Sequence, residues 1–322
     1  MMLGSILFWR AEFNAARHEL ETALSLYNVT EQRAKMLSMQ IDPGINAHLH
    51  LGGTLWMLGF PDTALDTSNS AVTLARQMGQ PFALAQALFF DCIVKWWRGE
   101  IPAAEAAAAE LRAIATEYQI TFLSATAPLL EGGLLIAAGQ SELGLQRIGQ
   151  AFSAFQVQQA NLGKPLMMAV MAIGHFRAGM EEEAMSTLAA GISAAETSGE
   201  HQWLAELYRL KGEFLASRQN PRMSDAEACV REAIDIAVQQ GALSLELRAA
   251  MTLCRMAKAR GEVEKAADML VPVFSRFQEG FDTADLREAK SLLQELGITP
   301  DIRREQAVRA GQSQCQSSSM LK

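Results

Sequence analysis

The stretch ELYRLKGEF, residues 206–214, has the composition of a helix with one glycine, Gly212, in its interior. A glycine there costs about 1 kcal/mol relative to alanine, so it usually has a packing reason. Steps of forty residues back from Gly212 reach only small side chains: Ala172, Gly132, Cys92 and Gly52. Forty-two residues forward lies Cys254. A small residue that recurs at a fixed period predicts a repeat protein, whose units stack because none can bury its apolar face alone.

A second series of small residues follows the first. Twelve positions after most members of the first series stand Ala64, Ala104, Gly144, Ala184 and Ala266, and in a unit with a longer corner Ala226 takes this place. Five positions before most of these stands a glycine: Gly59, Gly99, Gly139, Gly179 and Gly261. Glycine ends helices because it adopts the left-handed conformation without strain. Each unit is therefore predicted to be two helices joined by a glycine corner, with the small residues where the helices cross closely.

This spacing resembles the tetratricopeptide repeat, in which a small residue is followed by alanine twelve positions later. The period is forty rather than the usual 34, which predicts longer helices. Charged residues replace the expected leucine at Asp91, Glu131 and Lys211. We therefore expect an all-α fold, a right-handed α-solenoid of about seven tetratricopeptide-like helix pairs.

The same register predicts how the chain is divided. The step from Gly4 to Gly52 is eight residues longer than the other steps, and residues 311–319 are almost entirely Gln and Ser. The apolar opening at residues 3–9 indicates a missing N-terminal partner or a shortened gene product. The predicted segments are a truncated first pair at 1–27, an insertion or linker at 28–45, the solenoid with a final single helix at 46–299, and a disordered tail at 300–322.

A narrower resemblance covers nearly the whole chain. Its residues are 205–213, 225–229, 244–250, 279–286 and 288–290. They are similar to the C-terminal helical region of large bacterial signalling ATPases. The resemblance implies an upstream AAA-type or signal-transduction ATPase domain, often fused to an adenylate/guanylate cyclase or a DNA-binding domain. It makes those N-terminal domains, or another protein, the expected partner.

Composition and motifs exclude several classes of function. The net charge of −8 argues against a nucleic-acid surface. No apolar run is long enough to span a bilayer, and four cysteines without ligand spacing fit a reducing, cytoplasmic location. We find no phosphate loop, nucleophile elbow or zinc spacing, so the sequence predicts no catalytic, cofactor-binding or metal-binding residues.

The family's register also predicts which residues face the inner groove. They are Trp56, Trp96, Trp97, Ile136, Phe176, Glu213, Arg255 and Lys258. Tryptophans at such a face bind a partner helix or peptide, or else pack against the longer neighbouring helices. The leading hypothesis is a non-catalytic protein-interaction and regulatory module. The alternative is a small-ligand sensor, and an enzyme is a distant third.

Overall fold

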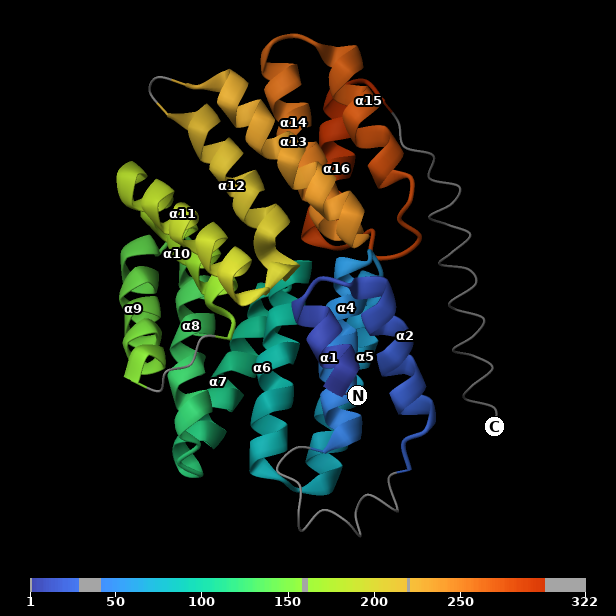
Figure 1. Cartoon of the computed structure of the whole chain (residues 1–322), viewed down its shortest axis with the longest axis vertical. Helices are drawn as coiled ribbons and strands as arrows, with labels where there is room; N and C mark the ends of the chain where they lie inside the picture. Colours follow the sequence, from blue (N-terminus) through green and yellow to red (C-terminus); the bar gives the residue numbers. More distant parts are fainter. Residues whose placement is uncertain (1, 29–41, 158–161, 219–220, 299–322) are drawn as a thin grey trace.

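The computed structural model describes residues 2–28, 42–157, 162–218 and 221–298. In these residues seven helix pairs follow one another, with one more helix at the end (Figure 1). The pairs are α1 (Met2–Trp9) with α2 (Phe13–Ser25), α4 (Pro43–Met57) with α5 (Pro61–Met78), α6 (Pro81–Arg98) with α7 (Ile101–Glu117), α8 (Thr121–Ala137) with α9 (Ser141–Val157), α10 (Lys164–Arg177) with α11 (Glu181–Ser198), α12 (Leu204–Ser217) with α13 (Met223–Gln240), and α14 (Leu243–Ala259) with α15 (Val263–Phe274). A short 3-10 turn, η2 (His201–Trp203), precedes α12, and α16 (Ala284–Glu295) comes last. The predicted all-α solenoid of helix pairs is confirmed.

The corners within the pairs have the predicted backbone conformation. Gly59, Gly99, Gly139, Gly179 and Gly261 all have positive φ, between 78° and 89°. In the first pair the same place is held by Ala11, with φ 63°. Alanine adopts this conformation only at a cost, because its Cβ approaches the following carbonyl oxygen. In these five pairs the glycine corner lets the second helix fold back against the first without strain.

The two series of small residues lie at the helix crossings inside the pairs, and all twelve are buried. A Cβ atom built on Gly132 of α8 would lie 2.7 Å from the carbonyl oxygen of Gly144 in α9. A Cβ built on Gly212 of α12 would lie 2.7 Å from the carbonyl oxygen of Ala226 in α13. Real side chains do not approach a carbonyl oxygen this closely. At these two crossings the backbones therefore touch in a way that only glycine permits.

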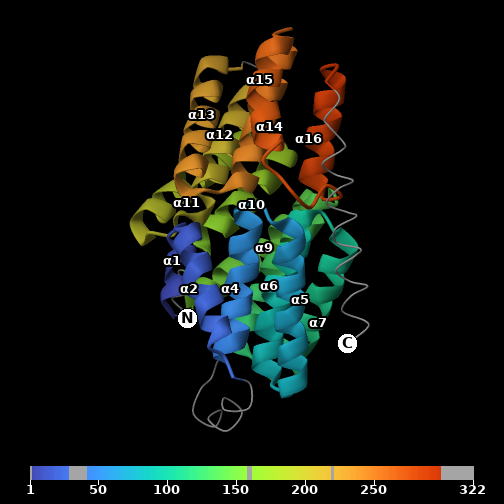
Figure 2. The same cartoon turned by 90° about the vertical axis from the view of Figure 1, so that its right-hand side faces the viewer.

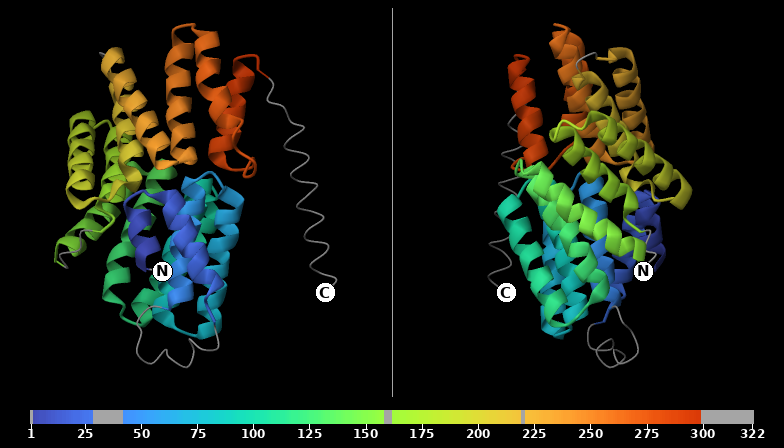
Figure 3. Two further views of the ribbon diagram at one scale, coloured as in Figure 1. Left: turned by 45° about the vertical axis from the view of Figure 1, so that its right-hand side comes forward. Right: turned by 90° about the vertical axis from the view of Figure 1, so that its left-hand side faces the viewer.

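The array curves until its seventh pair meets its second. Ser244 at the start of α14 donates its hydroxyl to the carbonyl oxygen of Trp56 in α4, at 2.5 Å. The carboxylate of Glu279 accepts hydrogen bonds from the backbone N–H and the hydroxyl of Thr63, both at 2.8 Å. Figure 2 shows α14 and α16 seated above α4 and α5, and Figure 3 shows the same arrangement from two other sides. We call these contacts the closure.

The predicted division of the chain differs from the structure at one boundary, and two of the predicted segments lie mostly outside the described residues. Helix α4 begins at Pro43, earlier than the predicted start at 46, with the Asp42 carboxylate accepting from the Ile45 N–H. Most of the predicted insertion at 28–45 and nearly all of the predicted tail at 300–322 lie outside the described residues. Among the described residues, no helix combines the length and the apolar character needed to cross a membrane.

Candidate functional site: an apolar pocket on the inner face

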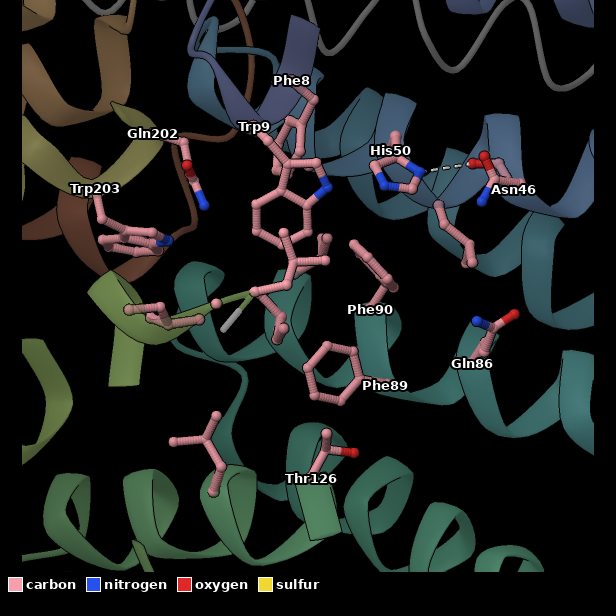
Figure 4. A pocket seen from close by; sticks show the side chains of 18 of the residues that line it. Phe8, Trp9, Asn46, His50, Gln86, Phe89, Phe90, Thr126, Gln202 and Trp203 are labelled. Atoms are coloured by element: carbon pink, nitrogen blue, oxygen red, sulfur yellow. Dashed lines mark hydrogen bonds between the residues drawn. The ribbon is translucent and has the colours of Figure 1, made fainter. Parts of the chain in front are cut away.

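The first helices of the early pairs enclose a cavity of about 250 Å³ on their inner side. Its walls come from α1, α4, α6, α8 and the start of α10, and η2 covers one end (Figure 4). We call it the concave pocket. Seven of its 21 lining residues are aromatic: Phe8, Trp9, Phe89, Phe90, Trp97, Phe122 and Trp203. A concave, mostly apolar cavity with a few polar groups is the usual form of a ligand site.

Three tryptophans join the pocket wall to the closure. The Trp97 ring lies 5.3 Å from the Trp203 ring and 4.7 Å from the Trp56 ring, centre to centre. Behind Trp56, the Arg248 guanidinium of α14 lies 4.9 Å from the ring centre. The pocket and the closure therefore share a continuous packed contact, which runs from Trp203 to Arg248.

The closure carries a buried charge network next to this contact. Arg248 pairs with Asp285 at 2.7 Å, and Glu206 pairs with Arg209 at 2.8 Å. Burial alone would raise the pKa of Glu206, but the charges of Arg209 and Arg248 outweigh it and lower that pKa. The ionised network thus holds α12, α14 and α16 together beside the pocket.

Among the described residues that line the pocket, His50 is the one titratable side chain. Its ring packs against Phe8 and Phe90, with ring centres 5.7 Å and 5.2 Å away. Its Nδ1 lies 3.0 Å from the Asn46 carbonyl oxygen and 3.2 Å from the Ser5 hydroxyl. Burial lowers the pKa of His50 to about 4, although the hydrogen bond to Asn46 opposes this. At neutral pH the imidazole is uncharged.

The remaining polar groups of the pocket fall into two sets. Asn46 accepts from the Ser5 hydroxyl at 2.9 Å, and the Thr126 hydroxyl donates to the Leu123 carbonyl oxygen at 3.0 Å. By contrast, the buried amide oxygens of Gln86 and Gln202 have no hydrogen-bond partner among the described residues. Gln202 lies near the Glu200 carboxylate without reaching hydrogen-bond geometry with it. None of the residues that line the pocket is Asp, Glu, Lys or Arg.

The predicted groove residues are spread over several places. Trp56 and Ile136 are buried, each 2 % exposed, and the Trp96 ring lies directly over Gly133 of α8. Only Trp97 lines the concave pocket. Phe176 stacks on Phe214 with ring centres 4.0 Å apart.

The charged members of the predicted groove each have an ion-pair partner. Glu213 pairs with Arg209, Arg255 with Glu288, and Lys258 with Glu295. The packing role that the sequence left open for the tryptophans describes Trp56 and Trp96. Partner binding by any of the eight predicted residues stays a prediction.

Most of the pocket wall was not singled out from the sequence. Phe8 and Trp9 belong to the apolar opening that was interpreted as the sign of a missing partner or a shortened gene product, yet Phe8 is buried and both line the pocket. Met2, Leu3 and Ile6 on the same helix are exposed, at 74 %, 52 % and 52 %. Phe8 and Trp9 stand four and five positions after the small residue Gly4, and this spacing could have predicted that they face the inner groove. The described residues contain no group of three or more His, Cys, Asp or Glu side chains that could hold a metal ion.

No protein-family model matches the chain. A curated relative, an uncharacterized protein of Rhizobium meliloti (strain 1021), is 24% identical over 249 residues, which is 75% of this chain. The chain spans about a quarter of that relative's length, 24%.

Three solved structures of Rap proteins have a similar fold, and each match covers 91% of this chain. The Rap conjugation gene regulator of the plasmid pLS20, in complex with a Phr peptide, has a TM-score of 0.61 at 13% identity over 72% of its own chain. The apo form of RapI gives 0.57 at 13% identity over 99% of its chain. A Rap protein complexed with Competence and Sporulation Factor gives 0.57 at 14% identity over 85% of its chain. At these identities the likeness concerns the fold, a tetratricopeptide-like solenoid similar to that of Rap regulators.

Proposed function

We propose that this chain is a non-catalytic regulatory module that binds another molecule on its inner face, with the concave pocket as the recognition site. The observation that carries the proposal is the pocket itself. It is lined by seven aromatic residues and by no ionised group, and it lies where the first helices of the pairs converge. Such a surface favours anchoring an apolar group of a partner.

A peptide or a protein segment is the first candidate for the bound molecule. Solenoids present curved inner surfaces that suit extended partners. Two of the Rap structures with this fold are complexes, one with a Phr peptide and one with Competence and Sporulation Factor. Such a segment would place one apolar side chain in the concave pocket.

The signalling context is part of the same proposal. The sequence resembles the C-terminal region of bacterial signalling ATPases, and the matched curated relative is about four times as long as the matched segment. We propose that the module acts on an ATPase or cyclase domain, in the same polypeptide or as a separate partner. In this account nucleotide chemistry belongs to that partner, and the module works in the cytoplasm.

A small effector molecule is the second candidate. The pocket is enclosed by helices on several sides and by η2, and its volume of about 250 Å³ suits a small molecule better than an extended chain. Binding there would act on the closure through Trp97 and Trp56.

The test uses a side chain at the edge of the pocket. Leu162 lines the pocket and is 54 % exposed, so replacing it by Glu places a charge beside the apolar opening at little cost to the fold. Wild type and Leu162→Glu are each used for affinity capture from the source cell, with metabolite and peptide profiling of the eluates. We expect the variant to lose the captured molecule by about tenfold or more, because a hot-spot contact contributes roughly 2 kcal/mol.

Leu143→Glu is the matched control. Leu143 is an exposed leucine, 43 % exposed, on α9 and outside the pocket lining. It should retain everything that wild type captures. Equal capture by Leu162→Glu and Leu143→Glu would contradict the assignment of the pocket.

A further inference from the structure

We infer that the concave pocket binds a small, uncharged, largely aromatic molecule that carries hydrogen-bond donors, which the amide oxygens of Gln86 and Gln202 accept. The inference rests on the proposed function, because it names the class of ligand for the same site. Three independent properties of the pocket support it: its size, its lack of ionised groups and the unpaired amide oxygens of two glutamines.

The size sets the lower and upper limits. An apolar cavity of about 150 Å³ holds one benzene ring. The concave pocket, at about 250 Å³, has room for a body of two or three rings. Aromatic faces and edges from Trp9, Phe90 and Trp203 surround this space (Figure 4). Rings of that kind favour offset stacking and edge-to-face contact with an aromatic guest.

The charge of the lining excludes ionic ligands. A buried charge needs a paired opposite charge, since its desolvation is not otherwise compensated. The lining contains no Asp, Glu, Lys or Arg, and His50 is neutral at pH 7. A sulfonate, carboxylate or ammonium group inside the pocket would therefore have no ionised partner, whereas a neutral molecule loses nothing on this account.

The two glutamines define the polar pattern of the ligand. Gln202 is 1 % exposed, and Figure 4 shows it on the opposite side of the aromatic group from Gln86. Each has a buried amide oxygen without a donor among the described residues, and the buried amide nitrogen of Gln202 has no acceptor among them. The other polar groups of the pocket, on Asn46, His50 and Thr126, already have partners within the protein. An unmade hydrogen bond of a buried amide is costly, so a ligand N–H or O–H directed at either oxygen would bind better than its hydrocarbon analogue.

Three probes with nearly the same aromatic body test this pattern on the full chain. N-phenylnaphthylamine is neutral and has one N–H, and its fluorescence rises in apolar surroundings. Phenylnaphthalene lacks the N–H, and its affinity is measured by displacement of the fluorescent probe. Anilinonaphthalenesulfonate keeps the N–H and adds a negative charge. We expect N-phenylnaphthylamine to bind about three- to tenfold more tightly than phenylnaphthalene, as one net hydrogen bond supplies. The sulfonate should bind at least tenfold more weakly than the neutral amine.

Gln202→Leu and Gln86→Leu locate the effect. Each variant removes an unpaired buried amide oxygen and keeps the approximate volume, so folding should be retained or improved. The preference for the donor-bearing probe should fall toward equality in one or both variants, while phenylnaphthalene binds at least as well as before. Equal affinities of the two neutral probes for wild type, or a preference unchanged in both variants, would overturn the inference. Tight binding of the sulfonate to wild type would also overturn the inference, if Leu162→Glu weakens that binding and so places it in the pocket. The affinity capture that compares wild type with Leu162→Glu does not use these probes. The proposed function can therefore hold even if this inference fails, with a peptide as the bound molecule.

Discussion

His50 links the stability of the fold to pH. Burial lowers its pKa to about 4 from the ordinary 6.5, so the folded protein disfavours the charged ring. The unfolded chain takes up a proton near pH 6.5, whereas the folded chain does so only near pH 4. The stability that neutral His50 contributes is therefore complete above about pH 6.5 and is lost as the pH falls toward 4. We expect a loss of about 3 kcal/mol in unfolding free energy across this window, at roughly 1.4 kcal/mol per unit.

Denaturant titrations of wild type and His50→Gln at a series of pH values measure this effect. The glutamine keeps a polar group near Asn46 and Ser5 but does not titrate. Its unfolding free energy should decline less steeply between pH 6.5 and 4. Parallel acid slopes for the two proteins would show that other groups cause the decline.

The sequence could not single out His50. His48 and His50 are two positions apart, so they lie on different sides of one helix. The inward position of His50 depends on packing against Phe8, more than forty positions away. By contrast, two of the three charged residues at expected leucine positions have partners that account for them. Asp91 pairs with Lys95 at 2.5 Å and accepts from the Ser68 hydroxyl at 3.1 Å, and Glu131 pairs with Arg112 at 2.9 Å.

At the scale of the helix pair, Gly132 tests the close crossing of α8 and α9. A methyl group added there would lie 2.7 Å from the Gly144 carbonyl oxygen and 2.5 Å from Cγ1 of Ile148. Because backbone cannot move aside as a flexible side chain does, Gly132→Ala should lower the unfolding free energy by about 1–3 kcal/mol. Thermal and denaturant unfolding measure the change.

Gly149 provides a control within α9. A Cβ built on Gly149 meets nothing within 4 Å. Gly149→Ala should therefore raise the unfolding free energy by up to about 1 kcal/mol, the difference in helix propensity. Opposite signs for the two glycine-to-alanine changes are the expected result, and equal signs would contradict the crossing.

The helix pairs were predictable because the signal for each is local. The small residues and the glycine corner of each pair lie within one unit, and the forty-residue period relates neighbouring units. The 3-10 turn at residues 201–203 was not predicted, since the sequence there continues the helical pattern into α12. That turn carries Gln202 and Trp203, so the missed element is also the one that covers the pocket.

For the whole molecule, Arg248 tests the closure. It lies over Trp56, pairs with Asp285 of α16, and is 18 % exposed in its side chain. Arg248→Met keeps much of the packing but leaves Asp285 without this partner in a largely buried place. Breaking such a pair costs several kcal/mol when it is fully buried, so we expect a loss of about 2 kcal/mol or more in unfolding free energy.

Arg255→Met is the comparison on the same two helices. Arg255 pairs with Glu288 of α16, but its side chain is 42 % exposed. Solvent-exposed pairs contribute about 0–1 kcal/mol, so this variant should stay within that range. Equal destabilisation by the two variants would contradict a special role for the buried Arg248–Asp285 pair beside the closure.

The concave pocket is a property of the whole molecule, which is why the sequence did not predict it. Its wall combines the first helix with residues some two hundred positions later, Phe8 and Trp9 with Gln202 and Trp203. That meeting depends on the angle accumulated over successive pairs, and small differences in each crossing add along the array. The period in the sequence predicts the helix pairs, but it does not predict the accumulated angle between distant pairs.

Hydrogen exchange on the complex captured by the wild-type chain tests the central claim most directly. We expect the bound molecule to slow amide exchange in α1, α4, α6, α8, η2 and the start of α10, the elements that line the pocket. The outward second helices α5, α7 and α9 should change little. Protection confined to those second helices, or to α14–α16 without the pocket, would contradict the claim that the chain binds its effector on the inner face.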